Sequence, residues 1–255
     1  MRAVFERRIA RAAALAELWP AAGEVLRLFR SASALQADVA EQIAVAHSSH
    51  PRELASFLPR AVELARRDAP AGLAAVADRW QSLRREGWEA ALDLFLSGAT
   101  QDPSDRFLSK LLLEPYYAAA RMTSRPAPRR TAASHQACEH CGSPPGAGIL
   151  WEDPAAGAIV RSCVCSLCAH EWRAPRVACP GCAEEAPDSL PRYSAAEIPW
   201  IRIEACDACR TYLKSVDRTA APEAEPVADE VASLALDVLA QERGYTKLEP
   251  NLAGL

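Results

Sequence analysis

The sequence lacks any long hydrophobic run. In its 255 residues no uninterrupted apolar stretch approaches the roughly 20 residues that a membrane-spanning helix requires. The first twenty residues also lack the continuous apolar core of a secretion signal, because arginine and glutamate interrupt them. We therefore expect a cytoplasmic protein that does not insert into a membrane.

Cysteine is absent from the first 137 residues and from the last 46, so all nine cysteines lie between positions 138 and 209. Eight of the nine form four C-x-x-C pairs. A chain expected to remain in the cytoplasm is a poor candidate for a disulfide framework. The clustered pairs therefore indicate metal ligation.

The chain has no excess of positive charge and no familiar catalytic motif. Its net charge is −4, and residues 136–217 carry 7 basic against 11 acidic side chains. A nucleic-acid-binding protein normally has a basic footprint, so this count disfavours DNA and RNA as partners. The motifs G-x-S-x-G, the P-loop and G-x-G-x-x-G are missing. We predict a binding protein without catalytic residues and not an enzyme.

Apolar residues recur at helical spacing throughout residues 1–122, which predicts a bundle of five or six helices. Pro51 is placed to open a helix at its first position, and Gly87 should break another. Asp102 followed by proline has the pattern of a helix N-cap. Pro115, near the end of the same helix, should kink or end it.

Two weakly structured segments flank the cysteine region. Residues 123–135 hold two prolines, three arginines and no aliphatic side chain larger than alanine, which predicts a linker. Residues 218–255 should form a tail with one apolar helical stripe from Val227 to Val238, closed by Gly244. We expect this tail helix to pack back on one of the domains.

The cysteine region is a duplication. Each half reads C-x2-C-x23-C-x2-C, and adding 41 to the first four positions gives the second four. The first set lies in a predicted module of residues 136–176 and the second in residues 177–217. The ligand positions are Cys138, Cys141, Cys165 and Cys168 in the first set, and Cys179, Cys182, Cys206 and Cys209 in the second.

Four thiolates on two short turns are what a tetrahedral metal site requires. We therefore predict two metal ions per chain, either zinc or rubredoxin-type iron, since both accept this ligand set. The segments 159–161 and 200–202 occupy the same offset in the two halves and should be equivalent strands. A cross-braced arrangement, with pairs exchanged between the halves, remains an alternative.

Other reactive side chains have simpler interpretations. Cys163 has a glutamate as its counterpart in the second half and is interpreted as a small packing residue. His140 and His170 are interpreted as polar residues of the C-x-x-C turns, because no ligand is missing. His47 and His50 should lie at a solvated helix end.

The cysteine region resembles the formate dehydrogenase accessory protein family, FdhE. The resemblance covers about 80 residues and rests on C-E-H-C-G-S-P-P from Cys138, on C-S-L-C followed by Glu171-Trp172, and on C-D-A-C-R-T-Y-L-K from Cys206. The helical first half is similar in layout. Cys163 departs from the family pattern, and so does Arg210, where the pattern leads us to expect glycine.

The resemblance implies a cytoplasmic, non-catalytic maturation factor, or chaperone, with rubredoxin-like metal centres for which iron is reported. Its partner would be the catalytic subunit of a respiratory formate dehydrogenase, bound before export by the twin-arginine route. By the same resemblance the eight repeated cysteines are the metal ligands. A rubredoxin-like electron-transfer protein and a zinc-ribbon regulator are the alternatives, and the charge disfavours the regulator.

An acidic face beside the second set is a candidate docking surface for the client, including its basic twin-arginine signal. Carboxylates gather there at Glu184, Glu185, Asp188 and Glu204. Such a contact should be weakened by salt, because exposed charges are screened. A groove between the helical bundle and the metal modules is the alternative, and the carboxylates would then only maintain solubility.

Overall fold

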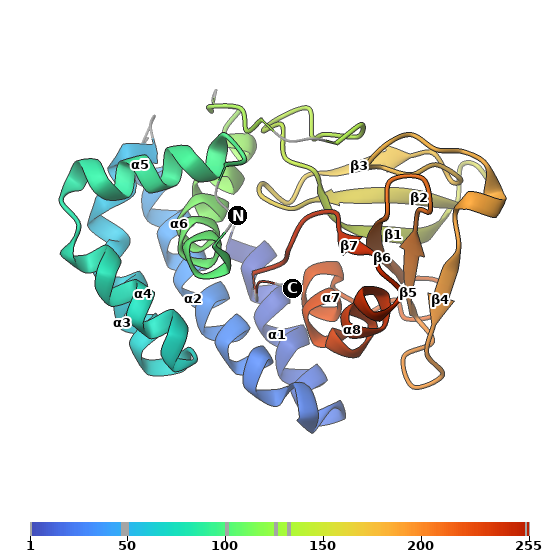
Figure 1. The fold of residues 1–255 in the computed structure, drawn as a ribbon, viewed down its shortest axis with the longest axis horizontal. Coiled ribbons are helices and arrows are strands. Elements are labelled where there is room, and N and C mark those ends of the chain that lie inside the picture. Colours follow the sequence, from blue (N-terminus) through green and yellow to red (C-terminus); the bar gives the residue numbers. More distant parts are fainter. Residues whose placement is uncertain are drawn as a thin grey trace.

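The computed structural model describes residues 2–46, 51–99, 102–124, 127–131, 134–252 and 254. Helices occupy one side of the molecule and a twisted sheet the other, with two C-terminal helices between them (Figure 1). No helix within the described residues is long and apolar enough to cross a membrane. The expected solvated helix end at His47 and His50 lies outside the described residues.

The first half forms the predicted helical bundle. Its helices are α1 Arg2–Leu18, α2 Gly23–Ala46, α3 Leu58–Asp68, α4 Ala71–Ser82, α5 Arg85–Leu96 and α6 Pro103–Met122. Helix α6 begins as predicted, because the Asp102 carboxylate accepts the backbone N–H groups of Ser104 and Asp105. Short 3-10 turns, Pro20–Ala22 and Pro51–Phe57, precede α2 and α3.

Two predicted helix boundaries are wrong. Pro51 opens the 3-10 turn, and the α-helix begins only at Leu58. The break between α4 and α5 falls at Leu83, and Gly87 lies inside the first turn of α5. Glycine weakens a helix by only about 1 kcal/mol, and the side chains of α5 that face the bundle more than offset this cost.

Pro115 does not end its helix, contrary to one of the two predicted outcomes. Helix α6 continues through Pro115 to Met122. Every residue from Phe107 to Ala120 is buried, since α6 lies against α2, α3, α4 and α5. This burial offsets the backbone hydrogen bond that proline cannot donate.

The two modules share one sheet. Each contributes three strands, and the order across the sheet is β3-β2-β1-β6-β5-β4. The bounds are β1 Pro145–Asp153, β2 Ala158–Cys165, β3 Glu171–Ala174, β4 Arg192–Ser194, β5 Ile201–Ala205 and β6 Thr211–Asp217. The predicted strands before the second turn of each module correspond to β2 and β5.

A parallel pairing of β1 with β6 joins the modules, with Gly148 opposite Ser215. A Cβ atom on Gly148 would lie 2.1 Å from the Ser215 hydroxyl and 3.1 Å from its Cβ. Any larger residue would force the buried Ser215 side chain to move, so glycine suits this close approach of the two strands. The junction makes the duplicated modules one continuous layer.

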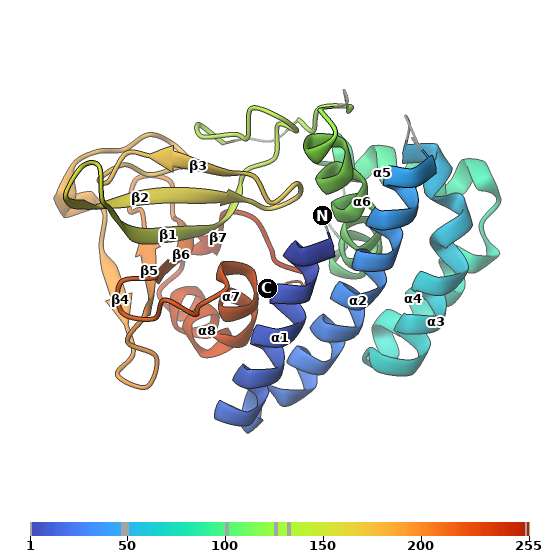
Figure 2. The same cartoon turned by 180° about the vertical axis from the view of Figure 1, so that it is seen from behind.

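The tail forms two short helices, α7 Pro226–Ala232 and α8 Leu234–Glu242, and a short strand, β7 Thr246–Lys247. The prediction of one apolar helical stripe from Val227 to Val238 is therefore wrong. The helix is interrupted at Ser233, and Val238 is exposed. Gly244 ends α8 with φ +76°, as the sequence predicts. Both views place α7 and α8 between α1 and the sheet (Figures 1 and 2).

Polar and aromatic contacts join the helical bundle to the tail and the sheet. The Arg11 guanidinium donates to both Asp229 carboxylate oxygens at 2.8 and 2.7 Å. The Trp19 and Trp200 rings stack with centroids 5.4 Å apart. Helix α7 thus fills part of the space where the sequence suggested a groove between the bundle and the metal modules.

Candidate metal centres

Each C-x-x-C pair forms the same tight turn, a knuckle. In all four knuckles the backbone N–H of the first cysteine donates to the carbonyl five residues later, at 2.8–2.9 Å. The residue after the second cysteine adopts a left-handed conformation each time: φ is +76° at Gly142, +55° at Ala169, +65° at Ala183 and +57° at Arg210. The duplication read from the spacing is therefore also a duplication of backbone geometry.

Only one of these left-handed positions is a glycine, and its surroundings require it. A Cβ atom on Gly142 would lie 2.4 Å from the Arg130 carbonyl oxygen. At Arg210, where the family pattern led us to expect glycine, the turn keeps the same shape. The Arg210 side chain holds it by donating to Asp207 and to the Arg243 carbonyl, and by lying over the Tyr245 ring.

The first set of thiols is buried and compact. The Sγ atoms of Cys138 and Cys168 lie 3.5 Å apart, and those of Cys141 and Cys165 lie 3.3 Å apart. All four side chains are almost fully shielded from solvent. The backbone N–H groups of Leu167 and Cys168 point at the Cys165 sulfur at 3.4 Å, which favours a thiolate.

The second set has the same arrangement but more solvent contact. Cys179 and Cys209 have Sγ atoms 3.6 Å apart, as do Cys182 and Cys206. Cys182 is exposed and Cys209 is half-buried. The Gly181 N–H donates to the Cys179 sulfur at 3.3 Å. The two sets therefore contain the same four sulfur donors but differ in their exposure to solvent.

The donor geometry fits tetrahedral S4 coordination. A tetrahedron with metal–sulfur bonds of about 2.3 Å has edges of about 3.8 Å. The observed edges of 3.3–3.6 Å are close to this value and far above the length of a disulfide bond. The thiols group as first set and second set, so the structure shows the tandem arrangement and not the cross-braced one.

Cys163 lies on β2 outside both sets. It is fully buried, and burial raises the pKa of its thiol to about 11, so the group is neutral. Its Sγ lies 3.9 Å from the Gln136 side-chain oxygen, a weak contact. These features fit the predicted packing role.

His140 and His170, which sequence reasoning treated separately, come together beside the first set. Their rings meet edge to face with centroids 4.3 Å apart, and both Nε2 atoms face the Glu139 carboxylate. Burial lowers the pKa of His170 from its ordinary value. Only the three-dimensional approach of two knuckles creates this group, since His140 and His170 belong to different C-x-x-C pairs.

A hollow of about 470 Å³ opens beside the first set, between α6 and the knuckles. Its wall includes Tyr117 and Arg121 from α6, Arg129 from the predicted linker, and Cys141 and Cys168 from the first set. It lies where the helical bundle meets the first module, between which the sequence suggested a groove. The guanidinium groups give this hollow a positive rim, in contrast to the net negative charge of the modules.

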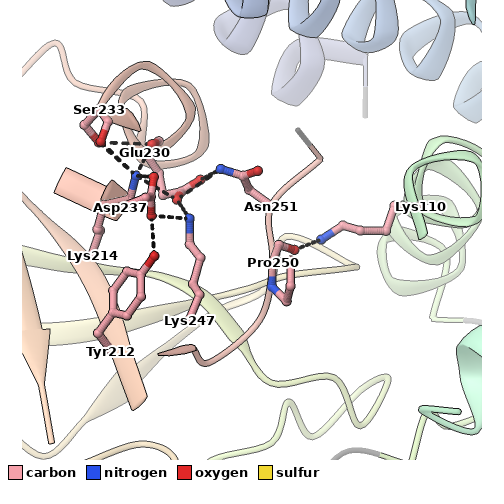
Figure 3. Close-up of polar contacts among 9 residues, drawn as sticks. All are labelled: Lys110, Tyr212, Lys214, Glu230, Ser233, Asp237, Lys247, Pro250 and Asn251. Atoms are coloured by element: carbon pink, nitrogen blue, oxygen red, sulfur yellow. Dashed lines mark hydrogen bonds and ion pairs between the residues drawn. The ribbon is translucent and has the colours of Figure 1, made fainter. Parts of the chain in front are cut away.

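A buried charge network anchors the tail to the strand that follows Cys209 (Figure 3). The ammonium group of Lys214 lies 2.5 Å from Asp237, and that of Lys247 lies 2.9 Å from the same carboxylate. Both lysines also contact Glu230, and Tyr212 donates to Asp237 at 2.7 Å. Sequence reasoning used the T-Y-L-K segment only as a family signature and missed this role.

The predicted acidic face is smaller than expected. Glu204 is largely buried, and Arg161 and Arg202 bind its carboxylate at 2.8 and 2.6 Å. Burial alone would raise the pKa of Glu204, but the two arginines lower it overall. The Glu184 carboxylate accepts backbone N–H groups of its own loop. Among the four carboxylates, Glu185 and Asp188 remain exposed.

Comparisons with known proteins give a consistent result. The family model for the FdhE C-terminal domain matches residues 177–253. A protein FdhE homolog of Aquifex aeolicus is 34% identical over 119 residues, covering 46% of this chain and 41% of the relative. A homolog of Pseudomonas aeruginosa is 39% identical over 123 residues, covering 47% of this chain and 40% of the relative. The matched segment thus spans about two fifths of each relative's length.

The structural comparison covers nearly the whole chain. The crystal structure of the FdhE protein from Pseudomonas aeruginosa superposes with a TM-score of 0.70 and 25% identity, over 99% of this chain and 96% of that one. The similarity therefore includes the helical half, where sequence motifs are weak. The chain is therefore similar to FdhE proteins both in the sequence of its cysteine region and in its overall fold.

Proposed function

We propose that the protein is a cytoplasmic accessory factor for a respiratory formate dehydrogenase. It binds the catalytic subunit before export and is needed for that subunit's activity. The observation that carries this proposal is the match to FdhE proteins in both the cysteine region and the overall fold. The role in maturation is what the family resemblance implies for this chain.

The eight repeated cysteines are the proposed ligands of two metal ions, iron or zinc. Four sulfurs at each centre fill every position of a tetrahedral ion, which leaves no site for a substrate or an activated water. This closed coordination supports a binding role and not catalysis. When bound, each metal ion would link two knuckles whose cysteines are 24 or more residues apart in sequence.

The client surface that we propose lies on the acidic side of the second module. Glu185 and Asp188 are exposed there, next to a knuckle whose Cys182 is also exposed. A basic segment of the client, such as a twin-arginine signal, would be attracted to this side. Opposite charges accelerate the encounter and make it sensitive to salt.

Affinity capture in the native host under anaerobic conditions tests the role. Tagged full-length protein should retain the formate dehydrogenase catalytic subunit, and deletion of the gene should abolish formate oxidation while the subunit is still synthesised. Normal formate oxidation in the deletion strain would refute the proposal.

The surface is tested by measuring client affinity from low to moderate salt. Glu185→Gln with Asp188→Asn should weaken binding and flatten its salt dependence. The control variant, Asp78→Asn with Glu86→Gln, removes the same charge from the surface of the helical bundle. It should leave the client affinity and its salt dependence unchanged. Equal client affinity in the two double variants would refute docking on the acidic side. The hollow beside the first set would then be the better candidate for the docking site.

Electron transfer is the second candidate function, and one observation favours it. The second set reaches solvent through Cys182 and Cys209, as a centre that exchanges electrons with a partner requires. Iron-loaded protein would then show a coloured ferric centre with a reversible one-electron couple. A zinc-only protein purified from the native host would exclude this function.

A further inference from the structure

Glu139, His140 and His170 form a cluster of metal-binding side chains outside both cysteine sets. One Glu139 carboxylate oxygen lies 3.6 Å from Nε2 of His140 and 3.4 Å from Nε2 of His170. These separations are too long for well-formed N–H···O hydrogen bonds, which have donor–acceptor distances of about 2.7–3.2 Å. No well-formed hydrogen bond therefore joins this carboxylate oxygen to either imidazole.

The same separations match the edges of a metal coordination shell. Tetrahedral zinc with bonds of about 2.0–2.1 Å to nitrogen and oxygen has ligand–ligand edges of about 3.3–3.4 Å. The carboxylate–imidazole distances of 3.4 and 3.6 Å are close to that value, and the donor atoms of all three residues lie within 4.8 Å of one another. The three donors can therefore ligate one ion after small side-chain adjustments.

Ring contacts orient the two histidines, and backbone hydrogen bonds fix the chain at Glu139 and His170. The His170 ring stacks on Trp172 with an interplanar angle of 16° and meets the His140 ring edge to face. The His170 carbonyl accepts the N–H of Cys165 in the knuckle bond, and the Glu139 carbonyl accepts from the Arg129 side chain. Both knuckles of the first set thus position the cluster.

We propose that Glu139, His140 and His170 form a third metal site, which takes a labile divalent transition ion such as zinc or ferrous iron. Two imidazoles and one carboxylate suit these ions. Glu139 is 76% exposed and His140 is 43% exposed, so a fourth coordination position faces solvent. The first set, once it holds a divalent ion, carries a net charge of about −2 and attracts a nearby cation.

This site differs in kind from the cysteine sets. Its ligands are harder, it has three protein donors and not four, and it lies at the surface. An ion here would exchange readily and would accept a ligand from solvent or from a bound partner. The inference does not depend on the proposed role in formate dehydrogenase maturation.

The test uses full-length protein with both cysteine sets filled with zinc, which is spectroscopically silent. Cobalt(II) is then added, and absorption and metal content are recorded. We expect a third ion per chain with d–d bands and no sulfur-to-cobalt charge-transfer band. Two ions at saturation, or a charge-transfer band that accompanies all added cobalt, would overturn the proposal.

Substitutions locate the ion. His140→Gln with His170→Gln should abolish binding of the third ion while the two zinc ions are retained, which also shows that the variant is folded. Glu139→Gln should weaken cobalt binding at least about tenfold, because loss of a ligand should matter no less than loss of its outer-shell partners. His135→Gln removes a histidine outside the cluster and should bind cobalt normally. Retention of the third ion in the double histidine variant would refute the assignment.

Discussion

The buried charge network provides the sharpest test of how the tail is attached. We predict that Asp237→Asn lowers the free energy of unfolding by about 3–5 kcal/mol, the usual effect of removing one partner from a buried ion pair. Lys214 and Lys247 would then share the single carboxylate of Glu230. Since whole domains are stable by only about 5–15 kcal/mol, this loss should be large enough to measure easily.

The structure supports the upper part of this range. The side chains of Lys214 and Asp237 are 0% exposed, so water cannot replace the lost interaction. Asparagine matches aspartate in shape, and the effect therefore reports charge and hydrogen bonding and not a cavity. Asp78→Asn is the matched control, because Asp78 pairs with Arg66 at the surface and should contribute at most about 1 kcal/mol.

Urea unfolding of metal-loaded protein, followed by far-ultraviolet circular dichroism, measures both changes. The double variant Lys214→Met with Asp237→Asn restores neutrality, and its cost should fall below the sum of the single costs by about 1–3 kcal/mol. If Asp237→Asn costs no more than Asp78→Asn, these charges do not form a buried network and the reasoning is wrong.

The variant Asp237→Asn should also change how the free energy of unfolding depends on acid pH. Burial raises the pKa of Asp237, but Lys214 and Lys247 more than offset this and lower it overall. A carboxylate with a lowered folded-state pKa stabilises the protein above its ordinary pKa, and this contribution is lost as the pH falls through the folded value. The stability difference between wild type and Asp237→Asn should therefore shrink in acid.

The remaining predictions concern the metal centres. Ala183→Gly should stabilise the protein by about 0.5–1 kcal/mol, because glycine adopts the left-handed conformation without strain, and a rise in the thermal midpoint would show it. Cys163→Ser should leave two metal ions per chain, whereas Cys138→Ser should lower the metal content by one; metal loss in the Cys163 variant would show that the ligand assignment is wrong. A chelator should remove metal in two phases, the faster from the second set, where Cys182 and Cys209 meet solvent. Cys138→Ser should then eliminate the slow phase, and a single phase in wild type would contradict the difference in burial.

Local patterns in the sequence were sufficient to group the cysteines and to predict most helices. The eight cysteines could be assigned to two sets because each knuckle is a four-residue turn and the offset of 41 repeats without error. Asp102 marked the start of α6, since capping involves only neighbouring residues. Pro115 does not end α6, one of its two predicted outcomes, because burial from Phe107 to Ala120 outweighs the local preference of proline.

Charge and exposure could not be predicted in the same way. Glu204 looked like part of an acidic surface, but Arg161 of the neighbouring module binds it across the sheet. Equal spacing suggested equal sites, yet one set is buried under α6 and the other reaches solvent. Burial depends on what packs against a residue, and distant parts of the chain supply that packing.

By itself, the sequence determined the helical first half, the duplication, the four knuckles and the resemblance to FdhE proteins. Each of these depends on residues close together in the chain or on an exact repeat. Only the tertiary structure decided how these parts combine. The β1–β6 junction, the network that ties Lys214 to the tail, and the convergence of Glu139, His140 and His170 all join residues from separate segments. Such contacts arise when the chain folds back on itself, and neither periodicity nor composition records them.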